Sequence, residues 1–201
     1  MSINVCNDRS MASITSLPSG VSGSSLVLLE TQTASSSSTI SFTSNIDSTY
    51  KEYIFKFIDI HPATDGAHFT FQSSTNTGSS YGVTATTTCF ISRHHENDSA
   101  VYVDYQASDD EAQSTNFLRL SSGSGNGNDE SLVGTLHLFS PSDTTFVKHF
   151  ICRNQYYNDS DISIDWYMAG YFNTTSAVDA VQFKFSSGNI DAGTIKMYGV
   201  V

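Results

Sequence analysis

The sequence has little positive charge and few charged side chains of any kind. Lys and Arg together number 9 against 20 Asp and Glu in 201 residues, so the formal net charge is −11. A chain this acidic, with no basic cluster, is a poor partner for a nucleic-acid backbone or an anionic lipid surface. The composition therefore predicts that the protein does not bind nucleic acid.

Long apolar runs are also missing. No stretch approaches the roughly 20 apolar residues that a membrane-spanning helix needs, so we expect no membrane insertion. The N-terminus has no Lys pair followed by an apolar run, which predicts that the chain is not exported by a signal peptide. The three cysteines, Cys6, Cys89 and Cys152, lie far apart and form no CxxC pair. This spacing predicts free thiols in a reducing cytoplasm, with no disulfide framework and no zinc site.

Motifs that carry enzyme chemistry are absent as well. The sequence has no G-x-S-x-G nucleophile elbow and no glycine pattern for binding a nucleotide phosphate or a dinucleotide. We therefore expect no cofactor and no enzymatic activity. A glycan-cleaving enzyme stays open as a third hypothesis, because its two carboxylates would come from distant strands and would leave no local motif.

From residue 26 onward the pattern is that of short β-strands. In "EYIFKFIDI", for example, Tyr53, Phe55 and Phe57 fall on one face, which Asp59 would continue. The other face carries Ile54, Lys56, Ile58 and Ile60. His61-Pro62 should end that strand, because proline has no N–H to donate. The predicted strands are 26–33, 38–44, 52–60, 67–73, 82–92, 100–107, a short one near 117–120, 131–140, 145–153, 162–172, 180–187 and 193–201.

These strands are joined by short turns rich in Ser, Asn, Asp and Gly, with little helical periodicity between them. Such regular spacing favours an all-β, antiparallel β-sandwich over residues 26–201, and a jelly roll is the expected topology. Residues 108–130 form the longest polar stretch, and "SGSGNGND" at 122–129 predicts a flexible loop by its composition.

The first 25 residues differ from the rest. Met11, Ile14 and Leu17 are spaced by three, which would line one face of a helical turn that Pro18 ends. "SGVSGSS" at 19–25 then has the composition of a flexible tether. Two interpretations stand side by side: a disordered terminus, or a short arm that anchors the domain to another protein. The candidate anchoring residues are Ile3, Val5, Met11, Ile14 and Leu17.

Two polar clusters resemble metal sites but lack the necessary spacing. Within "SRHHENDS", the neighbours His94 and His95 would point to opposite faces of a strand, so a polar turn is the better interpretation. "NGNDE" at 126–130 lacks the spacing of an EF-hand loop, which favours a solvated turn. We therefore predict no metal site.

Several aromatic and sulfur-containing residues have both a structural and a functional interpretation. Trp166 lies in a strand with other aromatic residues, where a core position is the first interpretation and a sugar-stacking platform the second. Cys89 and Cys152 lie within apolar strands and are expected to be buried. Tyr156, Tyr157 and Asn158 follow the predicted strand 145–153, where exposed side chains could contact a glycan.

Three stretches carry a likeness to a known group of proteins: "EYIFKFIDIHPATD" (52–65), "SLVGTLHLFSPSDTTFVKHF" (131–150) and "AGYFNTTSAVDAVQFKFSSGNIDAGTIKMYGVV" (169–201). Together with the leader "INVCNDRSMASITSLPSGVSG", the chain resembles a family of short structural proteins of marine tailed phages such as cyanophages. The resemblance covers most of the chain and carries over no catalytic residue. It matches least well at 73–81 and 106–130.

The resemblance implies a non-enzymatic virion protein that is made in the host cytoplasm and displayed on the particle surface. It would be a capsid decoration or a short head or tail fibre, held to other virion proteins by its N-terminal arm. We expect a homo-oligomer, a trimer, whose several arms would bind one particle together. The alternative is a tail-fibre tip that recognises a glycan on the host surface.

Overall fold

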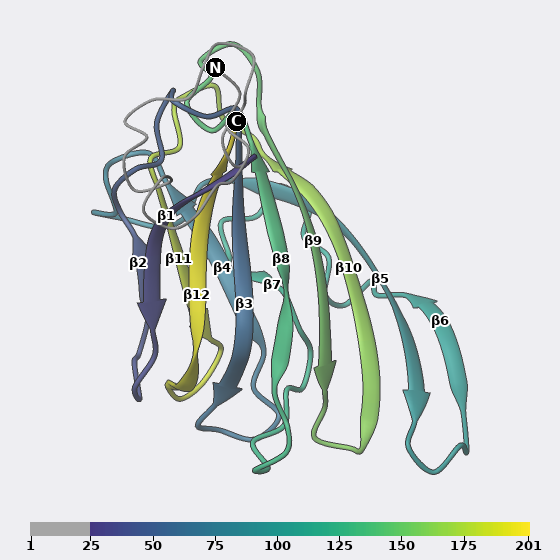
Figure 1. Cartoon of the computed structure of the whole chain (residues 1–201). Coiled ribbons are helices and arrows are strands. Elements are labelled where there is room, and N and C mark those ends of the chain that lie inside the picture. The colour runs from purple at the N-terminus through teal and green to yellow at the C-terminus, as the bar shows by residue number, and fades with distance from the viewer. Residues whose placement is uncertain (1–24) are drawn as a thin grey trace, which may run out of the picture.

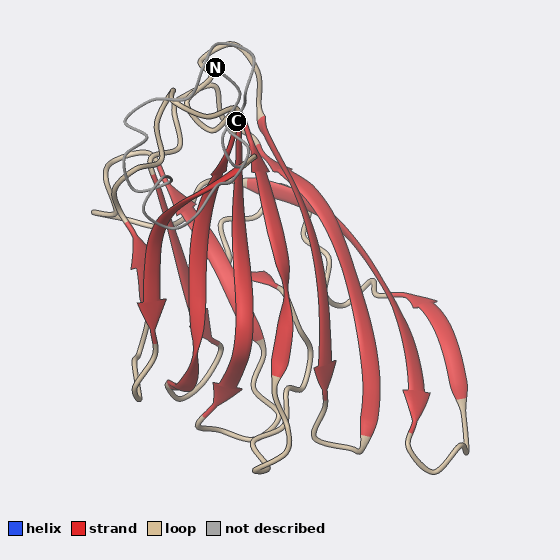
Figure 2. Ribbon diagram, in the orientation of Figure 1, coloured by secondary structure: helices blue, strands red, loops and turns tan. Residues whose placement is uncertain are grey.

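A computed structural model describes residues 25–201. The predicted anchoring residues Ile3, Val5, Met11, Ile14 and Leu17 lie outside these described residues, as does Cys6. The described part is built from strands, turns and loops (Figure 2). It contains no helix, and so none that could cross a lipid bilayer.

Twelve strands make up the fold: β1 (Leu26–Thr33), β2 (Ile40–Phe42), β3 (Glu52–Pro62), β4 (Phe69–Ser74), β5 (Ala85–His95), β6 (Val101–Tyr105), β7 (Leu118–Arg119), β8 (Leu132–Phe139), β9 (Lys148–Tyr157), β10 (Ile162–Phe172), β11 (Ala180–Phe185) and β12 (Ile190–Val200). The predicted strands 26–33 and 162–172 coincide with β1 and β10. Other boundaries moved: β3 continues through Pro62, and β9 continues to Tyr157.

The strands form two antiparallel sheets. The larger sheet has eight strands in the order β1-β12-β3-β8-β9-β10-β5-β6, and the smaller has four in the order β2-β11-β4-β7. Two groups of four, β1-β12-β3-β8 and β2-β11-β4-β7, have the strand order of an eight-stranded jelly roll. The predicted all-β antiparallel sandwich is therefore confirmed, with the jelly-roll order expected from the sequence.

Two inserted hairpins extend the jelly roll on one side. The β5–β6 and β9–β10 hairpins add four neighbouring strands, β9, β10, β5 and β6, beyond β8 of the larger sheet. We call these four strands the wing. Figure 1 shows the wing curving away from the part of the larger sheet that faces the smaller one. The wing thus carries sheet surface that the jelly roll itself does not cover.

An aromatic cluster joins the two sheets. Phe183 of β11 lies with its ring centroid 5.3–6.3 Å from the rings of five other phenylalanines, Phe42, Phe55, Phe57, Phe69 and Phe71. All six side chains are buried. Edge-to-face and offset ring pairs of this kind contribute beyond the apolar area they bury. The face of residues 53–57 that carries Phe55 and Phe57 is therefore the one that packs into this cluster.

That alternation changes at Asp59. Asp59 has a φ of 51°, and the pairing of β3 with β8 shifts register between Phe57 and Ile60. A bulge of this kind inserts an extra residue and reverses the faces that follow it. As a result Ile60 is fully buried and Asp59 is exposed, whereas simple alternation places Ile60 on the face opposite Phe57.

The segment 106–131, which joins β6 to β8 and contains the polar stretch 108–130, covers part of the wing's inner face, the face on the side of the smaller sheet. The Asn154 Nδ2 donates to the Leu120 carbonyl at 2.8 Å, and Leu120 itself is buried. Ser121 and Ser124 are buried too, with their hydroxyl oxygens 2.7 Å apart. The backbone N–H of Ser124 donates to Ala67 at 2.9 Å. Ser124, in the predicted flexible loop 122–129, is thus part of a cover for the sheet.

Replacing Phe183 by alanine should destabilise the domain by about 3–5 kcal/mol, because it opens a cavity between the two sheets. The change in the free energy of unfolding can be measured by denaturant titration. Phe146→Ala is the matched control, since the Phe146 side chain is 70% exposed and its loss should stay within about 0.5 kcal/mol. Equal effects of the two variants would contradict the central position of Phe183.

Candidate binding surface

The sequence-predicted glycan residues do not form one exposed site. Tyr156 lies within β9, its side chain is fully buried, and its ring packs 6.5 Å from Trp166. Its hydroxyl donates to the Ser122 carbonyl and accepts from the Ser122 N–H, both at 3.0 Å. Burial raises the pKa of this phenol. Tyr156 therefore cannot contact a glycan from solvent. The sequence did not indicate that Tyr156 is buried, because the predicted strand ended at residue 153. In the structure β9 continues to Tyr157, and the Tyr156 side chain points into the core.

The other two predicted glycan residues have structural partners as well. Asn158 is 8% exposed, and its Oδ1 accepts from the N–H groups of Ser160 and Ile162 in the β9–β10 turn. Asn158 is thus a turn-forming residue rather than a contact residue. Tyr157 is half-exposed, and its hydroxyl donates to Glu96 and Asp161. The hydrogen bond to Glu96 is the main cause that raises the pKa of Tyr157.

The structural interpretation holds for Trp166 and for the two described cysteines. Trp166 is fully buried, so it is a core residue and not a sugar-stacking platform. Cys89 and Cys152 are free and buried, as predicted. Burial raises the pKa of the Cys89 thiol to about 12 and raises that of Cys152 further. Both thiols are therefore protonated and shielded at neutral pH.

The polar clusters do not assemble into a metal centre in the part of the chain that the structure describes. Within residues 25–201, no three His, Cys, Asp or Glu side chains lie together as metal ligands would. His94 and His95 are the last two residues of β5, and the His94 Nε2 lies 3.0 Å from Asp98. The carboxylate of Glu130 accepts from the backbone N–H of Gly127, which closes a local turn.

The outer face of the wing, opposite the cover, carries a row of large side chains. Arg153, Tyr167, Phe90 and Tyr105 are direct cross-strand neighbours on β9, β10, β5 and β6. The Phe90 and Tyr167 rings stack at 4.7 Å with an interplanar angle of 4°, and the Arg153 guanidinium lies 4.9 Å from the Tyr167 ring. Phe90 is 45% and Tyr105 56% exposed. We call these four residues the aromatic row.

A charged pair holds one end of the aromatic row. Arg153 donates through Nε and Nη2 to the two carboxylate oxygens of Asp165, at 3.0 and 2.7 Å, and the Tyr167 hydroxyl donates to the same carboxylate at 3.0 Å. The hydrogen bonds from Arg153 are the main cause that lowers the pKa of Asp165. This bidentate geometry keeps both groups ionised and fixes the Tyr167 ring in place.

A shallow hollow of about 450 Å³ lies beside the row. Its floor is formed around Ala169, whose small side chain leaves space between Ile151 and Thr88, and Tyr171 and His149 border it. The lining is mostly apolar, and Ile151 is 53% exposed. The outer face of the wing therefore offers a shaped apolar surface next to fixed polar groups.

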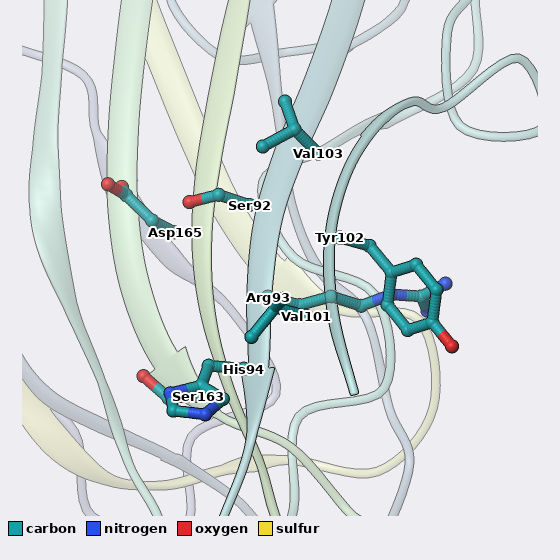
Figure 3. A pocket seen from close by; sticks show the side chains of 8 residues that line it. All are labelled: Ser92, Arg93, His94, Val101, Tyr102, Val103, Ser163 and Asp165. Atoms are coloured by element: carbon teal, nitrogen blue, oxygen red, sulfur yellow. The ribbon is translucent and has the colours of Figure 1, made fainter. Parts of the chain in front are cut away.

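A second hollow of about 400 Å³ lies toward the edge of the wing, between β10, β5 and β6 (Figure 3). Ser92, Val103 and Asp165 lie on the outer face of these strands. Arg93 and Tyr102 extend the other way in Figure 3, with the guanidinium 4.6 Å from the ring centroid. Hydroxyl, carboxylate and valine side chains thus meet here within one shallow surface.

No known protein family, curated protein or solved structure matches this chain. The features of the wing are therefore interpreted from their own geometry. Alternation within the predicted strand 100–107 places Val101, Val103 and Tyr105 on one side, but nothing in the pattern indicates that this side faces solvent.

Tyr156→Phe should lower the free energy of unfolding by about 1–3 kcal/mol, because it leaves the Ser122 N–H and carbonyl without their partner. Tyr157→Phe removes the same atom from a half-exposed ring and should change stability by no more than about 0.5 kcal/mol. Denaturant unfolding of the two variants gives the comparison. A larger loss for Tyr157→Phe than for Tyr156→Phe would contradict these roles.

Proposed function

We propose that this protein is a non-catalytic structural protein of a phage particle, displayed on its surface as a capsid decoration or a short head or tail fibre. The observation that carries the proposal is a jelly roll whose larger sheet extends into a wing with exposed apolar and aromatic side chains. Such a surface is suited to contact with a partner. The sequence resemblance described above supports a virion role, and the fold is one that virion proteins use among many others.

The position of Ser25, just before β1, supports an anchoring arm. Ser25 lies beside the last strand, where its carbonyl accepts from the Val201 N–H at 3.1 Å, and β1 forms one edge of the larger sheet. The wing ends at β6, the opposite edge of the same sheet. With about 4.8 Å between neighbouring strands, the two edges are about 34 Å apart along the sheet. Ser25 and the outer strand of the wing thus lie at opposite edges of the larger sheet.

Deleting residues 1–23 should leave a folded domain that no longer joins particles, because both sheets lie within residues 25–201. Thermal unfolding checks the fold of the truncated protein, and immunoblotting of purified particles measures its incorporation. Normal incorporation of a folded, truncated protein would contradict an anchoring arm.

Immunogold labelling of intact particles with antibody to residues 26–201 would show the position of the protein, and unlabelled, well-preserved particles would contradict surface display.

The second candidate function is recognition of a glycan on the host surface, and the aromatic row favours it. Sugar rings present apolar C–H faces that pack on aromatic side chains, and their hydroxyls pair with fixed carboxylate and guanidinium groups. Phe90, Tyr167, Arg153 and Asp165 offer both kinds of group on one face. This site replaces the one predicted from the sequence, since Tyr156 is buried.

If the wing binds a glycan, the intact protein should show saturable binding on a glycan array. Phe90→Ala combined with Asp165→Asn should weaken that binding by at least about tenfold, since each removes a contact of the order of 1 kcal/mol or more. Phe146→Ala serves as the control, because this exposed residue lies away from the row. Equal binding by all variants would contradict a site on the row.

A further inference from the structure

The two sheets formed by residues 25–201 have four edges, which are not equally protected against pairing with another chain. At the edge of the larger sheet, β1 shifts register between Leu28 and Glu30, and the two edge strands of the smaller sheet, β2 and β7, span three and two residues. Bulges, charges and short strands are the usual means of blocking edge pairing. The fourth edge, β6, is less protected: it has five residues, VYVDY, and pairs with β5 without a register shift. Its one charge, Asp104, lies on the inner face and is paired with Arg93 at 3.3 Å.

The backbone of β6 presents hydrogen-bonding groups to solvent. Ala100 accepts from the His95 N–H at 3.1 Å, and the Gln106 N–H donates to Cys89 at 2.9 Å. Antiparallel ladders alternate between hydrogen-bonded and non-hydrogen-bonded pairs, so Tyr102 and Asp104 direct their backbone groups toward β5. Val101, Val103 and Tyr105 direct theirs away from the sheet. The same three residues carry side chains that are 66%, 76% and 56% exposed.

We propose that β6 pairs antiparallel with the β6 of a second copy of this chain, about a two-fold axis that passes through Val103. The two eight-stranded sheets would then continue into one another. In this register Val103 faces Val103 of the second copy, and Val101 faces its Tyr105. By symmetry Tyr105 also faces Val101 of the second copy, which makes three facing pairs. Each pair exchanges two N–H···O bonds, so the contact gains about six hydrogen bonds. The proposal does not depend on the virion function proposed above.

The side chains are complementary on both faces in this register. On the outer face the cross-strand pairs are Val–Val and Val–Tyr, which stabilise a sheet. On the inner face Tyr102 of one copy lies opposite Asp104 of the other, so no two carboxylates face each other. Arg93 already lies 3.3 Å from Asp104 and over the Tyr102 ring. Its guanidinium is thus placed beside the Tyr102 that would face the second copy's Asp104.

Disulfide trapping of the full chain tests this register, with Cys6→Ser as background because Cys89 and Cys152 are buried. Val103→Cys should form a covalent dimer under mild oxidation, since facing residues lie about 5.5 Å apart, within disulfide range. Val101→Cys alone should not, because its two introduced thiols would sit on residues about 14 Å apart. Val101→Cys combined with Tyr105→Cys should cross-link again. Equal cross-linking by the Val101→Cys and Val103→Cys variants would overturn the register.

The native contact is tested without cross-linking by the molar mass of the unmodified protein. Light scattering or sedimentation should show a dimer, and Val103→Lys should weaken it by at least about tenfold, because two like charges would face each other on the axis. Unfolding of the variant should match the native domain, since Val103 is exposed. A native monomer at all concentrations would overturn the proposal. So would the trimer expected from the sequence, because a two-fold contact joins copies in pairs.

Discussion

An eight-stranded sheet packed against a four-stranded one leaves half of its inner face without a facing sheet, and the rest of this structure depends on how that face is covered. The jelly-roll half is covered by the phenylalanine cluster around Phe183. Part of the wing is covered by the segment 106–131, which supplies Leu118 and Leu120 as apolar contacts and satisfies polar groups of β9. A polar segment can fill this role because the Leu120 carbonyl accepts from Asn154 and the Ser122 backbone pairs with the Tyr156 hydroxyl. The Asn154 Oδ1 and the Trp166 indole N–H are buried without a hydrogen-bond partner on this face.

With the inner face of the wing partly covered, its outer face is the one that meets solvent. Trp166, Tyr156 and Met168 anchor the wing strands from within, while Tyr167, Phe90 and Arg153 alternate outward from the same strands. Strand periodicity thus produces a core and a display surface from one stretch of sequence. Strand pairing alone places the four side chains of the aromatic row next to one another. An exposed surface of this type, with shallow hollows beside a row of large side chains, is suited to contact with an extended partner, whether a glycan or another protein chain.

Local patterning was enough to predict most strands, because alternation and turn residues act within a few positions. The segment 162–172 and the strand 26–33 are found where the sequence indicated them. The failures have non-local causes. Asp59 adopts a positive φ within a bulge that the pairing with β8 and β12 requires, which moves Ile60 into the core. Tyr156 was predicted to be exposed because the predicted strand ended at residue 153. In the structure β9 continues four residues further, where it is paired on both sides by β8 and β10.

The sequence by itself determined the all-β class, the sandwich, the buried thiols and the core position of Trp166, since each follows from composition or from period-two alternation. Only the tertiary structure decided which strands lie at edges, which face of the wing meets solvent and where the stretch 106–131 lies. These depend on pairings between residues far apart in the chain, such as Thr87 with Gly170 or Leu118 with Phe71. Alternation shows that a strand has two faces, but the choice between core and solvent is made by what packs against each.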